Sequence, residues 1–213
     1  MINSRGILFS HSLATMNEAA VGFLLGSAIG VILAVGFFYF KSLEKILSPY
    51  VFLTQIFPKI SLAPILLIWL GFGMLPKVVI SALMSLFPVM VNMLTGLRST
   101  PTIRVDLFNS LFASKWQFFL KLYFPNSLIF LFPGLKSAIL LAIVGAIVGE
   151  FVSATFGLGY LIQVSSYQTN INLCFGAIIA LLIITILFYF VVEMFEYFIL
   201  RWQRLECVNE RRM

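Results

Sequence analysis

Five apolar runs of about 20 residues or more alternate along the chain with short stretches that carry most of the charged residues. A helix needs about 20 predominantly apolar residues to cross the hydrocarbon core of a bilayer. The runs therefore predict membrane-spanning helices at residues 19–40, 47–70, 78–97, 128–149 and 173–200. This pattern indicates an all-α integral membrane protein with a five-span core.

The composition agrees with one membrane domain at residues 19–202. Of the 213 residues, 61% are hydrophobic and 10% are charged, whereas soluble proteins carry roughly 25% charged residues. We expect residues 1–18 to form a polar lead outside the membrane and residues 203–213 to form a charged cytoplasmic tail. The net charge of +6 lies mainly at the ends of the apolar runs, so no separate basic domain is available for nucleic acid.

The distribution of basic residues predicts the direction of the spans. Lysine and arginine accumulate in the cytoplasmic loops of membrane proteins. With a cytoplasmic C-terminus, ten basic residues lie inside, and only Arg5 and Lys77 lie outside. This bias favours a multi-pass protein of the bacterial inner membrane, with its N-terminus outside and its C-terminus in the cytoplasm.

Small residues recur in the first apolar run. Gly22, Gly26 and Gly30 have a four-residue period, which places them on one helix face where another helix can approach closely. The alternative is that these glycines are simply scattered, because glycine is common in membrane helices.

The second run, residues 47–70, is interrupted by three prolines and a lysine. We expect it to be kinked or partly unwound. Broken backbone at membrane depth must be buried in protein or line a polar cavity, so this run either borders a translocation pathway or is a bent packing helix. The candidate pathway side chains are Gln55 and Lys59, together with Asn92 of the third run.

A polar loop, residues 98–126, separates the third and fourth runs and lies in the cytoplasm in this topology. Its apolar positions Ile103, Leu107 and Leu111 recur at helical spacing. Asp106 is expected near the start of this helix, where a carboxylate suits the positive end of the helix dipole.

A second short helix is predicted in the same loop. Ser114 can cap a helix that begins at Lys115, and Pro125 is expected to close the segment before the next span. The polar loop thus reads as two short helices along the inner surface. The alternative is a plain amphipathic surface helix without a docking partner.

The frame D-L-F-N-S-L-F-A-S-K-W-(x)8-P-N-S, which starts at Asp106, resembles the cytoplasmic loop of permeases from binding-protein-dependent ABC importers. Segments similar to residues 58–73, 87–98, 134–150 and 157–161 recur in this order in the nitrate/sulfonate/taurine branch. The resemblance implies the type I ABC importer permease fold, with a coupling loop that docks on a cytoplasmic ATPase subunit.

The resemblance also implies which residues couple to the ATPase. Asp106 stands at the signature's acidic position and Phe112 at its glycine, a departure that matters because glycine turns the chain at little steric cost. The implied coupling residues are Asp106, Leu107, Ser110, Phe112, Ala113, Trp116 and Pro125.

At the outer face, the resemblance implies contact with an extracytoplasmic substrate-binding protein. The candidate contacts are Gly157, Gly159, Gln163 and Tyr167, in a region that equally suits an ordinary solvated loop. Two permease copies are expected to pair in the lipid bilayer. The sequence holds no phosphate-binding P-loop, so the chain is expected to need no cofactor and to be no enzyme, with ATP bound by the partner subunit.

The implied function is import of a small solute by alternating access. Nitrate, sulfonate, taurine and bicarbonate suit the branch, and so does a vitamin precursor such as a thiamine pyrimidine. Family members usually begin with a further span before residues 19–40, so a truncated or degenerate permease is one alternative. A secondary transporter or channel that works alone is the other.

Overall fold

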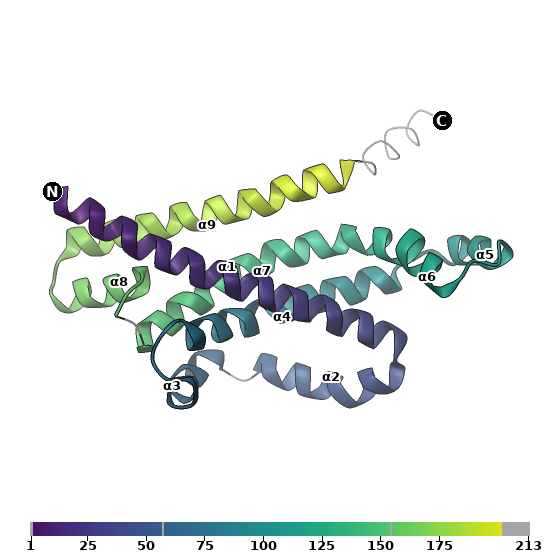
Figure 1. The fold of residues 1–213 in the computed structure, drawn as a ribbon, viewed down its shortest axis with the longest axis horizontal. Coiled ribbons are helices and arrows are strands. Elements are labelled where there is room, and N and C mark those ends of the chain that lie inside the picture. Colours follow the sequence, from purple (N-terminus) through teal and green to yellow (C-terminus); the bar gives the residue numbers. More distant parts are fainter. Residues whose placement is uncertain (1, 57, 154, 202–213) are drawn as a thin grey trace.

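The computed structural model describes residues 2–56, 58–153 and 155–201, and the regular structure in these ranges is helical (Figure 1). In chain order the elements are α1 (Ile2–Tyr39), α2 (Lys41–Ile56), the 3-10 turn η1 (Lys59–Leu62), α3 (Ala63–Leu70), α4 (Met74–Arg98), α5 (Thr102–Ser110), α6 (Lys115–Phe118), the π-helical turn η2 (Phe119–Tyr123), α7 (Phe124–Ser153), α8 (Leu158–Tyr167) and α9 (Ile171–Ile199). Within them, four helices are long and apolar enough to cross a membrane, namely α1, α4, α7 with the turn before it, and α9.

Helix α4 packs closely against α1 through glycine residues. Gly22 and Gly26 of α1 are buried, and a Cβ atom on either would overlap Ser81, Ala82 or Ser85 of α4. Gly30 meets the same helix one turn further on, at Leu86 and Val89. The predicted glycine face is therefore confirmed, because the period of four brings the two backbones together.

Helix α4 also packs against α7 through glycine residues. A Cβ atom at Gly145 would lie 2.7 Å from the Ser81 Cα, and one at Gly149 would lie 2.9 Å from the Lys77 Cα. The Ser81 hydroxyl also donates a hydrogen bond to the Ala142 carbonyl across this contact, at 2.8 Å. Helix α4 is thus held between α1 and α7 with little side-chain volume on either side.

The expected interruption of residues 47–70 is confirmed. Helix α2 ends at Ile56, two residues before Pro58, and the 3-10 turn η1 begins directly after this proline. Proline disfavours helical backbone in the residue before it. Pro64 lies in the first turn of α3, where its missing N–H costs nothing. Together α2 and α3 return the chain from the end of α1 to the start of α4 (Figure 1).

The first helix differs from expectation. We expected residues 1–18 to form a polar lead, but α1 already begins at Ile2 and continues without a break to Tyr39. Its polar side chains His11, Thr15 and Glu18 are buried. Helical spacing explains this, since positions i, i+4 and i+7 share one face.

Helix α9 is fastened to α7 by an ion pair. The Lys136 Nζ lies 2.6 Å from a Glu196 oxygen and 3.6 Å from a Glu193 oxygen. The same amine lies 5.4 Å from the centre of the Tyr189 ring. Lys136 near the end of an apolar run is thus neutralised by α9 carboxylates within the protein.

The glycine contacts predict an asymmetry between two matched substitutions. Gly26→Ala forces a methyl group into the α4 backbone, and overpacking of this kind costs about 1–3 kcal/mol. Gly176→Ala places its methyl group at an ordinary 3.6 Å from Leu8 and gains about 0.5–1 kcal/mol of helix propensity. Thermal unfolding in detergent is expected to show a lower Tm for Gly26→Ala and an equal or higher Tm for Gly176→Ala. Equal melting of both variants would contradict the close packing.

Candidate functional site

The polar loop projects from the end of the bundle that lies farthest from the start of α1 (Figure 1). It connects the last turn of α4 to the first turn of α7. Every side chain of α5 is exposed or half-buried. Ile103, Leu107 and Leu111 are all exposed and follow one another at four-residue intervals, so α5 carries an apolar face that no other part of the described chain covers.

The turn after α5 has the geometry that glycine usually provides. Phe112 has φ of +51°, in the left-handed region that costs an L-residue roughly 1–2 kcal/mol. The Phe112 N–H donates to the Asn109 carbonyl at 3.0 Å, and the Ala113 N–H donates to the Phe108 carbonyl at 3.1 Å. These two bonds form a Schellman motif, the common glycine-terminated end of a helix. The phenylalanine thus adopts the glycine conformation, and its ring is 95% exposed.

The predicted cap of the second short helix is confirmed. The Gln117 N–H donates to the Ser114 hydroxyl at 3.3 Å, and the Ser114 N–H donates to the Gln117 side-chain oxygen at 2.8 Å. This reciprocal pair is a capping box. The Phe108 and Phe118 rings pack with their centroids 5.5 Å apart, which brings α5 and α6 together across the turn.

Asp106 does not lie where the sequence suggested. Helix α5 begins at Thr102, so Asp106 is in the second turn, beyond the first-turn positions at which a carboxylate interacts well with the dipole. That prediction is wrong because the helix starts directly after Pro101. Among the described residues, the Asp106 carboxylate has no hydrogen-bond or ion-pair partner, whereas the Ser110 hydroxyl donates to the Asp106 backbone carbonyl at 3.0 Å.

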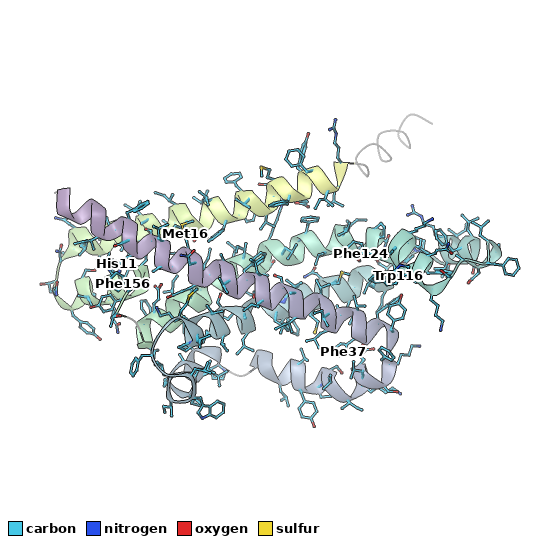
Figure 2. The ribbon with its side chains drawn as sticks, in the orientation of Figure 1. His11, Met16, Phe37, Trp116, Phe124 and Phe156 are labelled. Atoms are coloured by element: carbon cyan, nitrogen blue, oxygen red, sulfur yellow. The ribbon has the colours of Figure 1, made fainter. Side chains whose placement is uncertain are left out.

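Pro125 does not close the segment. The chain stays helical from Lys115 through Ser153, and the π-helical turn η2 directly precedes α7. Proline lacks an N–H and clashes with the carbonyl four residues before it, so the wider turn accommodates Pro125. Trp116, at the start of this stretch, is 68% exposed, and Figure 2 shows it at the loop end of the bundle.

The base of the polar loop is held rigidly. The Asn126 amide donates to the Gly96 carbonyl at 3.0 Å and to the Ser99 hydroxyl at 3.2 Å. A Cβ atom at Gly96 would lie 2.7 Å from the Ser127 Cα. The end of α4 and the start of α7 are therefore in backbone contact where the loop leaves them.

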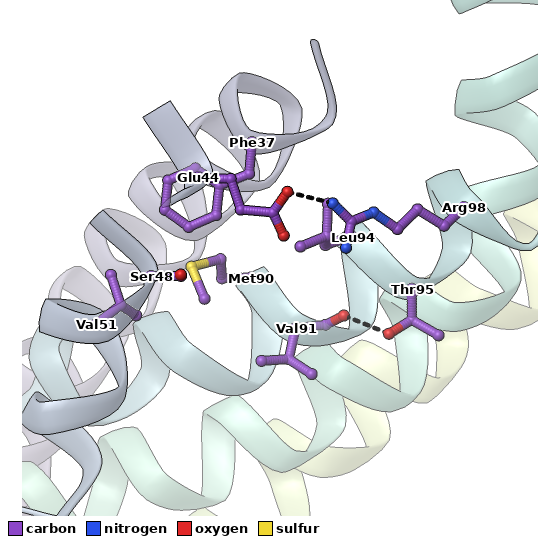
Figure 3. A pocket seen from close by; sticks show the side chains of 9 residues that line it. All are labelled: Phe37, Glu44, Ser48, Val51, Met90, Val91, Leu94, Thr95 and Arg98. Carbon is purple, nitrogen blue, oxygen red and sulfur yellow. Dashed lines mark hydrogen bonds and ion pairs between the residues drawn. The ribbon is translucent and has the colours of Figure 1, made fainter. Parts of the chain in front are cut away.

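A cavity of about 180 Å³ lies near the same end of the bundle, between α1, α2 and α4 (Figure 3). Its polar edge is an ion pair in which an Arg98 nitrogen lies 2.6 Å from a Glu44 oxygen. Phe37 and Met90 supply apolar walls. The cavity is small, and its charged side chains neutralise each other.

The pathway candidates do not converge on this cavity. The side chains of Gln55 and Lys59 lie outside the described part of the structure. Asn92 is half-buried, and its amide donates to the Pro88 carbonyl of its own helix at 2.8 Å. A Cβ atom at Gly134 would lie 2.8 Å from the Asn92 Cβ, so Asn92 packs between α4 and α7.

At the opposite end, a buried polar cluster is formed by side chains of α1, α4 and α7 and is bonded to the backbone at the start of α8. It consists of His11, Thr15, Glu18, Lys77 and Glu150. The Lys77 ammonium donates to a Glu18 oxygen at 2.5 Å, and both side chains are buried. The His11 ring stacks on Phe156 with a centroid distance of 4.9 Å (Figure 2).

The candidate binding-protein contacts lie beside this cluster. Gly157 and Gly159 are buried beneath the Glu150 carboxylate, which removes them from the accessible surface in this structure. Gln163 is half-buried, and Tyr167 at the end of α8 is 81% exposed. Of these four candidates, Tyr167 is the exposed one.

The comparisons with known proteins give first the class and then the family. The chain superposes on a chain of the inward-facing MetNI methionine ABC transporter with a TM-score of 0.80, at 18% identity, covering 91% of this chain and 96% of that one. The fold is thus that of type I ABC importer permeases. A family model described as "Binding-protein-dependent transport system inner membrane component" matches residues 26–204. The chain belongs to this family and is a multi-pass permease component of an ABC importer.

Three relatives have identities above 30%, and two of them are named for the compound that they transport. The riboflavin transport system permease protein RibX of Chloroflexus aurantiacus is 33% identical over 200 residues, covering 94% of this chain and 75% of the relative. The formylaminopyrimidine transport permease protein ThiX of Halalkalibacterium halodurans is 32% identical over 201 residues, covering 94% of this chain and 80% of the relative.

The strained turn predicts that glycine is tolerated better at position 112 than at position 111. Phe112→Gly removes the left-handed strain of about 1–2 kcal/mol. It also costs up to about 1 kcal/mol, because glycine loses more conformational freedom on folding, so the net change should stabilise the turn. Leu111→Gly, at φ of −86°, loses helix propensity without relieving strain. Hydrogen-exchange mass spectrometry should show slower exchange of residues 108–117 in Phe112→Gly and faster exchange in Leu111→Gly. Faster exchange in both would mean that the turn is unstrained.

Proposed function

We propose that this permease admits a small solute to the cell, and that a separate subunit hydrolyses ATP while docked on the polar loop. The observation that carries the proposal is the exposed apolar face of α5, which is followed along the loop by the exposed side chains of Phe112 and Trp116. Contiguous exposed apolar surface outside a membrane core marks interaction sites. The paired base at Gly96 and Asn126 lets the loop transmit force to α4 and α7.

The transport cycle follows from this arrangement. Two copies of the chain enclose the pathway in the inner membrane, each with its N-terminus outside, its C-terminus inside and its polar loop on one ATPase subunit. Closure of the ATPase pair on ATP displaces the two loops. Because α4 makes backbone contacts with α1 and α7, the three helices rock as one body. The pathway between the two copies then opens alternately to the outer and the inner side of the membrane.

The outer surface receives the solute from a substrate-binding protein. Tyr167 at the exposed end of α8 is its contact, with half-buried Gln163 one turn before it. Gly157 and Gly159 act indirectly, by shaping the turn on which α8 begins.

The solute is proposed from the described charges and from the relatives. Lys77 and Lys136, the described lysines of α4 and α7, are each paired with a glutamate, so neither offers an unpaired charge to an anion, whereas the side chain of Lys59 lies outside the described part of the structure. The relatives RibX and ThiX are named for riboflavin and formylaminopyrimidine. We therefore assign a neutral heteroaromatic compound of this kind as the solute, in preference to nitrate, bicarbonate or a sulfonate, and uptake assays with labelled compounds decide between them.

Docking predicts different effects for two substitutions that add the same charge to α5. Leu107→Asp places a carboxylate in the centre of the apolar face, and burial of an unpaired charge costs several kcal/mol. Asn109→Asp adds the same charge to an exposed position away from that face. Co-purification with the cognate ATPase is expected to fall at least about tenfold for Leu107→Asp, since 1.4 kcal/mol already changes affinity tenfold.

The control should retain the ATPase at the wild-type level. Retention by both variants would show that the apolar face is not the docking surface. Loss by both would assign docking to the net charge of the loop instead.

A further inference from the structure

The start of α8 is held by side chains from two other helices. Three consecutive backbone N–H groups donate to buried acceptors: Gly157 to the His11 Nδ1 at 3.0 Å, Leu158 to the Thr15 hydroxyl at 2.8 Å, and Gly159 to a Glu150 oxygen at 2.6 Å. The first N–H groups of a helix have no partner within it. Here α1 and α7 supply the partners that water would otherwise provide.

Glu150 is the centre of this arrangement. Its second oxygen accepts a hydrogen bond from the Thr15 hydroxyl at 2.6 Å, so one carboxylate joins α1, α7 and α8. Glu150 and Thr15 are both fully buried. A Cβ atom at Gly157 or Gly159 would overlap the Glu150 carboxylate. The turn before α8 is therefore shaped around this one side chain.

The apolar side of α8 faces a different helix. Leu158 and Leu161 pack with Ala177 and Ile184 of α9. These apolar contacts join α8 to α9 but give no directional link to α7. The link to α7 includes the Glu150 bond to Gly159, which is short, buried and directional.

Helix α7 connects this site to the polar loop. It runs for 30 residues from Phe124 to Ser153, a length of about 45 Å. Glu150 lies near its outer end, and Asn126 lies near its inner end, bonded to the last turn of α4. One continuous helix is thus bonded near one end to α8, the proposed contact of the binding protein, and near the other end to the base of the polar loop, the proposed contact of the ATPase.

We propose that Glu150 is a positioning residue that fixes α8 to α7, so that docking of the substrate-binding protein on α8 is transmitted along α7 to the polar loop. This inference rests on the proposed function. Without the Glu150 bonds, α8 keeps its apolar contact with α9 and its hydrogen bonds to His11 and Thr15 of α1, but it loses its direct hydrogen bond to α7. The ATPase still docks and hydrolyses ATP, and its response to the binding protein is lost.

The test uses the complete complex in proteoliposomes, with Glu150→Leu and Glu150→Gln as the paired variants. Leucine has a similar size and accepts no hydrogen bond, whereas glutamine can still accept from Gly159 and donate to Thr15. Basal ATP hydrolysis and its stimulation by the solute-loaded binding protein are measured. In parallel, spin labels at the exposed positions Val144→Cys and Tyr167→Cys, with the native cysteines replaced by serine, report the distance between α7 and the end of α8.

The expected result is a split between the two variants. Glu150→Leu keeps basal hydrolysis and shows a broadened distance distribution. Its stimulation by the binding protein falls about tenfold or more, which corresponds to an equilibrium shifted by at least 1.4 kcal/mol. Glu150→Gln retains both stimulation and a narrow distribution. Stimulation retained in Glu150→Leu, or lost with an unchanged narrow distribution, would overturn the proposal.

Further arms separate the possible failures. If Glu150→Leu does not assemble, Thr15→Val takes its place, because it removes the acceptor of the Leu158 N–H and one hydrogen-bond donor to Glu150. This variant should weaken the stimulation and broaden the spin-label distance distribution. No change in either would overturn the proposal. If the wild-type chain binds no ATPase, the proposed function fails, and the distance measurement still decides whether Glu150 holds α8.

Discussion

The backbone approach of α4 to α1 and α7 is the constraint on which the rest of the structure depends. Glycines on α1 and α7 meet α4 at Ser81 and Ser85, where even a methyl group does not fit. This packing leaves α4 little freedom to slide against its neighbours. Because the polar loop is the connection between α4 and α7, its position is determined by the same contact, which continues to Gly96 and Ser127 at the loop base.

A frame of this kind suits a transporter that works by moving whole helices. Packed helices with few side chains between them have discrete arrangements rather than a continuous range. The polar loop at one end and α8 at the other are both attached to α7, and both carry exposed side chains. Phe112 illustrates the local compromise: it takes the strained turn of a glycine and exposes its ring, which is costly for the isolated chain and useful at an interface.

Much of the fold could be predicted from periodicity and turn chemistry. The apolar runs, the glycine face at Gly22 and Gly26, the break near Pro58 and the cap at Ser114 are all local patterns. The buried polar cluster could not be found this way, because its members are distant in sequence: Thr15 and Glu150 are 135 residues apart, and Glu18 and Lys77 are 59 apart. The available signal was the spacing of His11, Thr15 and Glu18 on one helix face. Asp106 was misplaced because it is the fifth residue of α5, which begins at Thr102, so it lies in the middle of this short helix.

ATP-dependent uptake into proteoliposomes decides whether this chain imports a solute through a partner ATPase. The complex of permease, cognate ATPase and binding protein is supplied with labelled formylaminopyrimidine or labelled taurine. Uptake of the heteroaromatic compound is expected to require ATP, the ATPase and the binding protein together, and little taurine should enter. Uptake by the permease alone, driven by an ion gradient without ATP, would contradict this expectation.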